Sequence, residues 1–175
     1  MSYAFEDQAS IDFLAGLGES SAGANTALTL IPLGPADTGE ISPLIAGALV
    51  DGFVVYSVPY GEPHLNAVHA RGLPVVVCDQ PYPEEDVAFV GIDDHEAIKP
   101  AARALVEAGH RRIGVVGKRL FKDAAREGAV TKAEVEAADM HVQRARVLGA
   151  LDVFAEAGIT NVPVVTRHFN DYGSA

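Results

Sequence analysis

Basic residues are scarce in the first part of this 175-residue chain, and their absence excludes a class of function. Residues 1–70 hold eight Asp or Glu side chains and no Lys or Arg, and the formal net charge of the whole chain is −11. Proteins that grip nucleic acid through its phosphates need clustered cations. We therefore expect that these residues do not bind DNA by themselves.

Long apolar runs, export signals and paired cysteines are missing as well. No apolar run approaches the roughly 20 residues of a membrane-spanning helix, and the first residues lack a basic and then apolar export pattern. The single cysteine, Cys78, cannot form an internal disulfide, and its setting in PVVVCD favours a buried apolar position over a reactive thiol. The sequence predicts a cytoplasmic protein without a membrane partner.

What is present is enough apolar material for a core, because 49% of the residues are hydrophobic. Short β-branched runs alternate with segments of helical periodicity, and the runs are continuously apolar, as in parallel strands covered on both faces. This alternation predicts a doubly wound α/β fold. The predicted strands are 26–31, 53–58, 74–78, 112–116 and 162–166, and the predicted helices include 11–17, 41–49, 65–68, 98–106 and 147–155.

Several predicted helices carry end signals. Ser42 precedes a proline and can cap a helix, and Thr131 with Glu134 forms a capping-box pattern. Gly109 can stop a helix, and the basic residues 110–112 after it indicate a solvated connection to the next strand.

The start of the helix at 98–106 is less certain from the pattern. Asp93 and Asp94 stand where a strand gives way to a helix, and one of the two carboxylates can cap it or contact a ligand. Pro100 lies inside the apolar period and argues for a kink or a late start. The helix is therefore predicted without a firm first residue.

Candidate ligand contacts follow from the fold, because ligands of open parallel sheets collect beyond the carboxyl ends of the strands. Asp79 comes directly after the apolar run at 74–78 and can accept hydrogen bonds from a hydroxylated ligand. It can equally cap a turn before Pro81, and both interpretations stay open. The other residues at predicted strand ends are Ser57, Tyr60, Gln80, Lys118, Arg119, Arg167 and His168.

Arg146 is a further candidate. It lies early in the strongest amphipathic helix, three residues before Gly149 and on nearly the same face. A guanidinium near a helix start gains nothing from the helix dipole, so a bound carboxylate, phosphate or sugar hydroxyl would explain it, although packing remains the alternative.

Catalytic motifs are absent. The sequence has no G-x-S-x-G elbow, no phosphate loop and no G-x-G-x-x-G after a strand, and its six His residues show no metal-ligand spacing. We expect a binding protein without metal or cofactor, and not an enzyme.

The chain resembles a known family in five stretches: VDGFVVYSVP, RGLPVVVCDQP, VGIDD, EAGHRRIGVVG and RARVLGALDVFAEAGI. In this order and spacing they resemble the ligand-sensing core of the LacI family of bacterial transcription regulators. The resemblance implies a periplasmic-binding-protein-like α/β fold of type I with two doubly wound parallel-sheet subdomains, residues 1–92 and 93–175, both incomplete. The helix-turn-helix head and the first core strand of the family are missing from the sequence.

The resemblance also implies a function and a site. It implies a homodimer whose subdomains close on a small effector, a sugar or nucleobase, and thereby control operator binding by the missing DNA-reading head. Matched position by position, Arg146 corresponds to the arginine that contacts effector, Asp79 to the acid after the third strand, and Ser57 to a pocket position. Tyr3 and Phe5 fall near the aromatic lip.

Two other functions are alternatives. A periplasmic-type sugar-binding protein of a transport system shares the architecture, but the missing export signal speaks against it. A doubly wound kinase or reductase is disfavoured by the lack of phosphate and dinucleotide loops. Because the missing strand would lie between 26–31 and 53–58, backbone groups there are left unpaired, and we expect a poorly stable or oligomeric chain.

Overall fold

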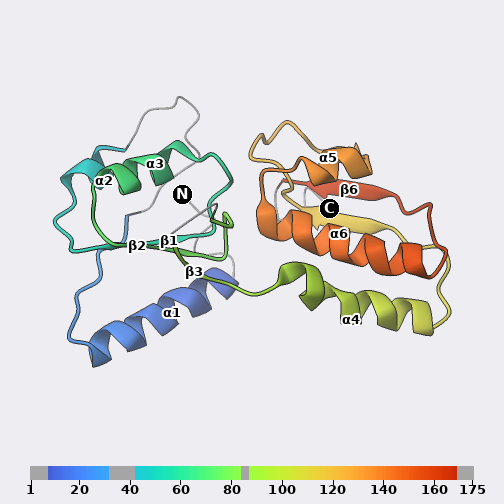
Figure 1. The fold of residues 1–175 in the computed structure, drawn as a ribbon, viewed down its shortest axis with the longest axis horizontal. Helices are drawn as coiled ribbons and strands as arrows, with labels where there is room; N and C mark the ends of the chain where they lie inside the picture. The colour runs from blue at the N-terminus through green and yellow to red at the C-terminus, as the bar shows by residue number, and fades with distance from the viewer. Residues whose placement is uncertain (1–7, 32–41, 84–86, 169–175) are drawn as a thin grey trace.

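A computed structural model of the chain describes residues 8–31, 42–83 and 87–168, so Tyr3 and Phe5 of the predicted site lie outside the described residues. It contains two three-stranded sheets, with strand orders β1-β2-β3 and β4-β6-β5 (Figure 1). The elements are α1 (Gln8–Gly23), α2 (Pro43–Gly47), β1 (Phe53–Tyr56), α3 (Pro63–Ala70), β2 (Val75–Cys78), β3 (Ala88–Val90), α4 (Asp94–Glu107), β4 (Val115–Lys118), β5 (Gly128–Val130), α5 (Lys132–Glu136), α6 (His141–Glu156) and β6 (Val164–Arg167).

The first sheet is wholly parallel. Phe53 of β1 is in register with Val75 of β2, and Val76 of β2 is in register with Ala88 of β3. Helices α2 and α3 lie on one side of this sheet and α1 lies on the other (Figure 1). The ring of Phe13 in α1 stacks on Tyr56 of β1 with centroids 4.0 Å apart. The sheet is thus layered between helices, as continuously apolar strands require.

The second sheet is mixed, since β4 pairs parallel with β6 while β5 pairs antiparallel with it. Helices α4 and α6 run side by side along this part of the molecule (Figure 1). They share an apolar core in which the Ala102 side chain of α4 packs with those of Ala150 and Phe154. A Cβ at Gly149 would collide with the carbonyl oxygen of His95, so the backbones of the two helices approach closely at this glycine.

The helix ends follow the predicted signals. Ser42 Oγ accepts from the Leu44 amide, and Thr131 and Glu134 form the complete capping box of α5. Gly109 follows α4 with a φ of +86°, the left-handed conformation that glycine adopts easily. Residues 110–112 are exposed, as expected of a solvated connection. These signals act within a few residues, and for that reason sequence alone predicts them.

The structure differs from the predicted secondary structure in one strand that is absent, one that was not predicted and the first residue of one helix. Residues 26–31 form no strand, because within the described residues no other strand offers them hydrogen bonds, and Leu28 stays 53% exposed. The antiparallel strand β5 was not predicted, and it is only three residues long. Helix α4 begins well before Pro100, because the Asp93 carboxylate accepts the Glu96 amide at 3.0 Å and caps the first turn.

Candidate functional site

Three of the four non-glycine residues that have positive φ in the described part of the chain come directly after strands. Ser57 follows β1, Asp79 follows β2 and Arg119 follows β4, with φ values of 51°, 70° and 44°. A left-handed backbone at such residues costs about 1–3 kcal/mol and is typical of ligand sites. The carboxyl ends of the parallel strands, where ligands were expected, are therefore also where backbone strain collects.

The loops after the first sheet contact the beginning of α6. The Tyr60 amide donates to the Asp139 carbonyl at 2.9 Å, and the Tyr82 amide donates to His141 Nδ1 at 3.0 Å. The rings of Tyr60 and His141 stack with centroids 5.2 Å apart. Side chains and backbone that follow β1 and β2 thus meet the residues that start α6, across a sequence gap of about sixty residues.

Gln80 is the fully buried member of this contact, with an exposed fraction of 0%. Its Oε1 accepts the Val142 amide at 3.0 Å, and its Nε2 donates to Ser57 Oγ at 3.2 Å. Sequence reasoning placed Gln80 only among the residues at strand ends. Its contact with α6 joins residues 62 positions apart, and no local signal indicates it.

Arg146 is held by a buried acid. Its Nε donates to Asp94 Oδ1 at 2.7 Å, and Asp94 Oδ2 accepts from the Tyr82 hydroxyl at 3.1 Å. Asp94 is 2% exposed, whereas the Arg146 side chain is 51% exposed. The two acids at the start of α4 therefore divide their roles, since Asp93 caps the helix and Asp94 orients the guanidinium.

Tyr82 connects Asp79 to this pair. Burial, and after it the charges of Asp94, Asp79 and Asp93 and the hydrogen bond to Asp94, together raise the pKa of Tyr82 to about 12. The charge of Asp79 thus acts on the same tyrosine that bonds Asp94, the partner of Arg146. Sequence reasoning named Asp94 as a helix cap or a ligand contact, and it missed the ion pair between Asp94 and Arg146.

A hollow of about 430 Å³ lies beside this neighbourhood, where the chain passes from β3 into α4. Its lining is mainly apolar, and Asp79, Ser57 and Arg146 do not line it. A Cβ at Gly91 would stand 2.6 Å from the Phe89 ring, so a larger residue there would require this side chain to move. The lining residues are Tyr82, Pro83, Phe89, Gly91, Ile92, Asp93, His95 and Ala145.

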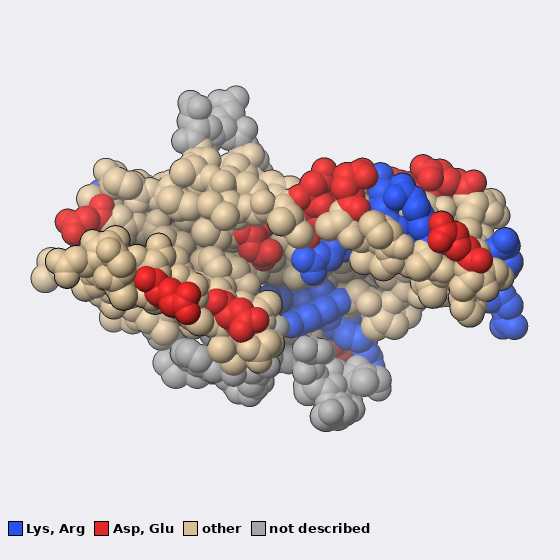
Figure 2. Space-filling model, turned by 90° about the horizontal axis from the view of Figure 1, so that it is seen from below, with Lys and Arg blue, Asp and Glu red and all other residues tan. Residues whose placement is uncertain are grey.

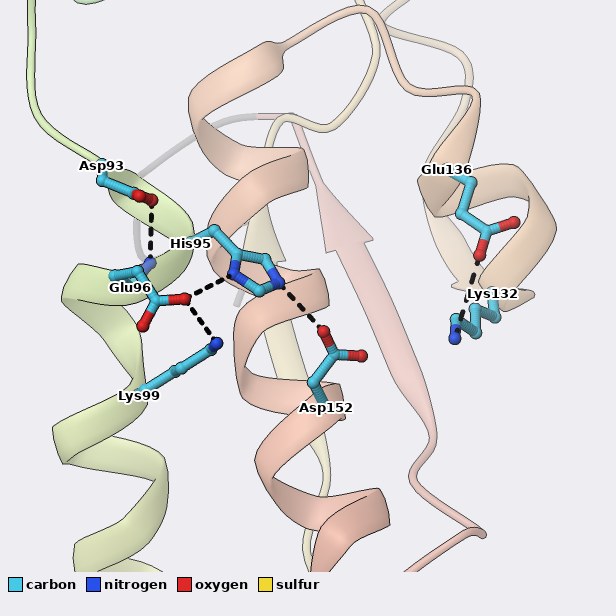
Figure 3. A network of polar contacts seen from close by, with 7 residues as sticks. All are labelled: Asp93, His95, Glu96, Lys99, Lys132, Glu136 and Asp152. Atoms are coloured by element: carbon cyan, nitrogen blue, oxygen red, sulfur yellow. Dashed lines mark hydrogen bonds and ion pairs between the residues drawn. The ribbon is translucent and has the colours of Figure 1, made fainter.

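His95, which lines the hollow, also makes polar contacts within α4 and between α4 and α6 (Figure 3). His95 Nε2 lies 2.9 Å from Asp152 Oδ2, and its Nδ1 lies 3.4 Å from Glu96 Oε1. Glu96 also pairs with Lys99, and chiefly this bond lowers the pKa of the Glu96 carboxyl. No group of three or more His, Cys, Asp or Glu side chains suits a metal ion within residues 8–31, 42–83 and 87–168.

Two further sequence expectations can be compared with the structure. Cys78 is buried, and burial together with Asp79 raises the pKa of its thiol, so the buried interpretation is confirmed.

On the face drawn in Figure 2, most Lys and Arg side chains lie over the part that carries the second sheet, interspersed with acidic ones. None of the helices in the described ranges has the length and apolarity to cross a membrane.

The profile of the family described as periplasmic binding proteins and sugar binding domain of LacI family matches residues 6–172. The chain belongs to this family. The LacI-family resemblance and the periplasmic-binding-protein-like α/β fold class predicted from the sequence are thereby confirmed.

Relatives and solved structures agree with this assignment. The chain is 48% identical to the HTH-type transcriptional regulator IpsA of Corynebacterium glutamicum, over 98% of this chain and 48% of the relative. It is 37% identical to an HTH-type transcriptional regulator of Mycobacterium tuberculosis, over 91% of this chain and 44% of that protein. The chain thus spans about half the length of the curated relatives that it matches.

A solved LacI-family transcriptional regulator from Corynebacterium glutamicum superposes with a TM-score of 0.87 at 47% identity, over 98% of this chain and 51% of that one. The complex of the regulator CelR with cellobiose superposes with a TM-score of 0.67 at 24% identity, over 92% of this chain and 45% of that one. The second likeness is one of fold.

Proposed function

We propose that this chain is the effector-sensing core of a LacI-type transcriptional regulator, and that it binds a small polar, sugar-like molecule between residues 1–92 and 93–175. The observation that carries the proposal is the pairing of half-exposed Arg146 with buried Asp94, next to the same tyrosine whose pKa Asp79 raises. The family description, which names sugar binding, supports the ligand class.

The chemistry of the three charged groups favours a neutral ligand. Asp94 holds Arg146 through Nε, which leaves the terminal nitrogens of the guanidinium to donate to a ligand oxygen. Asp79 can accept from a ligand hydroxyl. Because Asp94 balances the charge of Arg146 and Asp79 adds a negative charge, the neighbourhood suits a hydroxylated, uncharged molecule better than a phosphate.

Signalling would follow from linkage between ligand and geometry. The loops after β1 and β2 contact the start of α6, and Arg146 lies on α6. A ligand held by both Asp79 and Arg146 would bind one relative position of the two parts better than another, and would shift the population toward it. In a cytoplasmic homodimer this shift would change how attached helix-turn-helix heads meet operator DNA.

Exposed apolar side chains support the homodimer. Large apolar residues rarely gather on the surface of a monomer without a partner. Among the described residues up to 92 the exposed ones are Ile11, Leu28, Leu30, Leu44, Leu49, Val54, Tyr60, Val90 and Ile92. We expect light scattering after gel filtration to give twice the 18.3 kDa mass of the chain, and a monomer mass at micromolar concentration would contradict the dimer.

Titration calorimetry with neutral and charged sugars tests the effector site. The panel is D-glucose, D-galactose, cellobiose and glucose 6-phosphate, and we expect at least one neutral member to bind. Arg146→Ala should weaken it by about ten- to a hundred-fold, the loss of a charged hydrogen bond. Exposed Arg103→Ala on α4 is the control. Binding that is equal in Arg146→Ala and in the unchanged chain would remove Arg146 from the site.

The relatives disfavour other functions. Proteins that are 37–48% identical over nine-tenths or more of this chain are transcriptional regulators, not enzymes or transport proteins. A periplasmic sugar-binding role and a kinase or reductase role therefore remain less supported than the regulator.

A further inference from the structure

The buried amide of Gln80 lies between Ser57 and the beginning of α6, and its two ends contact groups from different parts of the chain. Oε1 is 3.0 Å from the Val142 nitrogen and Nε2 is 3.2 Å from Ser57 Oγ. Because Gln80 is 0% exposed, solvent does not compete for either contact. Only one of the two orientations of the Gln80 amide can satisfy both contacts.

The Val142 backbone decides that orientation. A backbone N–H can only donate, so the atom of Gln80 that faces Val142 has to be the carbonyl oxygen. The NH₂ group then faces Ser57, and an amide NH₂ can only donate. Ser57 Oγ is therefore the acceptor in this bond, and the proton of its own hydroxyl is left for another partner. Within the described residues the Ser57 hydroxyl has no second hydrogen bond.

The start of α6 strengthens this arrangement. Val142 is the second residue of α6, and the residue before the helix, Met140, provides no side-chain cap. Gln80 thus supplies from the first sheet an acceptor that the helix N-terminus needs. Donation from Val142 polarises the amide, and the polarised amide makes the Ser57 hydroxyl a better donor in turn. The partial positive charge at the start of α6 thus acts on the Ser57 hydroxyl through the Gln80 amide.

We propose that Gln80 directs the Ser57 hydroxyl proton toward the effector, because Ser57 Oγ accepts from the Gln80 amide and its proton is left for the ligand. This inference rests on the proposed function for its ligand, but not for its geometry. Asp79, at the end of the neighbouring strand β2, can only accept while it is ionised. The site would therefore distinguish ligand acceptors from ligand donors. An acceptor oxygen of the ligand, such as a ring or hydroxyl oxygen, would bind at Ser57, and a ligand hydroxyl that donates would bind at Asp79.

Gln80→Glu separates polarity from packing. While it is ionised, a carboxylate still accepts the Val142 amide and keeps the shape of the side chain, but its second oxygen can only accept, so the Ser57 hydroxyl donates to it instead of to a ligand. Gln80→Leu removes both bonds at a similar volume, and Ser57→Ala removes the hydroxyl alone. Exposed Asn161→Asp, outside the helices and strands, is the control for the added charge.

Amide exchange and side-chain NMR test the geometry without any ligand. Val142 should stay protected in Gln80→Glu and in Ser57→Ala, and should exchange at least ~10-fold faster in Gln80→Leu. The Gln80 NH₂ resonances should shift in Ser57→Ala. Unchanged Val142 exchange in Gln80→Leu, or unchanged Gln80 resonances in Ser57→Ala, would overturn the assigned polarity.

Titration with the sugar from the panel that binds best tests the consequence for the effector. Gln80→Glu and Ser57→Ala should each weaken binding by about ten-fold, and the double variant should be no weaker than either, because both remove the same donated bond. Wild-type affinity in Ser57→Ala would refute the donor role of Ser57. If no sugar binds the unchanged chain, the proposed function fails, while the NMR measurements still decide the polarity of Ser57.

Discussion

Replacing Gly149 by alanine tests how α4 and α6 are held together. The added Cβ would collide with the carbonyl oxygen of His95 and stand 2.9 Å from Ile98 Cγ2. The His95 atom belongs to the backbone of α4 and cannot swing aside, so the two helices must separate. Their shared core, which includes the Ala102, Ala150 and Phe154 side chains, would lose contacts as they do.

The size of the effect follows from two opposing terms. Overpacking of a close-packed interior costs about 1–3 kcal/mol or more, and a clash with backbone lies at the upper end of that range. Alanine in place of glycine inside a helix returns about 1 kcal/mol. We therefore expect the free energy of unfolding to fall by about 2 kcal/mol and the melting temperature to fall by about 4–8 °C.

Urea unfolding followed by circular dichroism measures this change. Gly16→Ala in α1 is the control, because no atom lies within 4 Å of its Cβ position, and we expect a gain of about 0.5–1 kcal/mol there. Both substitutions change helix propensity equally, so their difference isolates the clash. A Gly149→Ala chain as stable as the unchanged one would refute close packing of α4 on α6.

Three further predictions follow from single contacts. Asp94→Asn should lower the pKa of Tyr82 from about 12, and burial should keep it above 10. NMR titration of labelled tyrosine measures this pKa, and an unchanged value would contradict the prediction. Arg71→Ala should destabilise the chain by about 1–3 kcal/mol in urea, because the guanidinium donates to three carbonyls at the end of α2; no change would exclude that role. The Thr131 backbone bond lowers the pKa of Glu134, so its stabilisation is present above the ordinary value of 4.5 and is lost as pH falls through the lower folded value. Glu134→Gln should therefore lose less stability between pH 5 and pH 3, and equal losses would contradict the capping role.

Local signals predicted what depends on local physics. The apolar runs that became β1 and β2, the cap at Ser42 and the capping box at Thr131 were all found in the sequence, because each depends on residues only a few positions apart. The run at 26–31 has the same composition as a strand and is not one. A strand needs a neighbour to share its hydrogen bonds, and composition says nothing about whether the neighbour is there.

The candidate site, too, was predicted from the sequence in part, and the rest depended on contacts that form only in the folded chain. The sequence by itself determined the strand ends at which Ser57 and Asp79 lie, and the motif order that led to Arg146 and to the LacI family. Tertiary structure alone decided that Asp94 holds Arg146 from 52 positions away and that Gln80 caps α6 from 62 positions away. In each pair one partner, Asp94 or Gln80, is buried and needs the other as its hydrogen-bond partner, and burial at that position is a property of the whole fold.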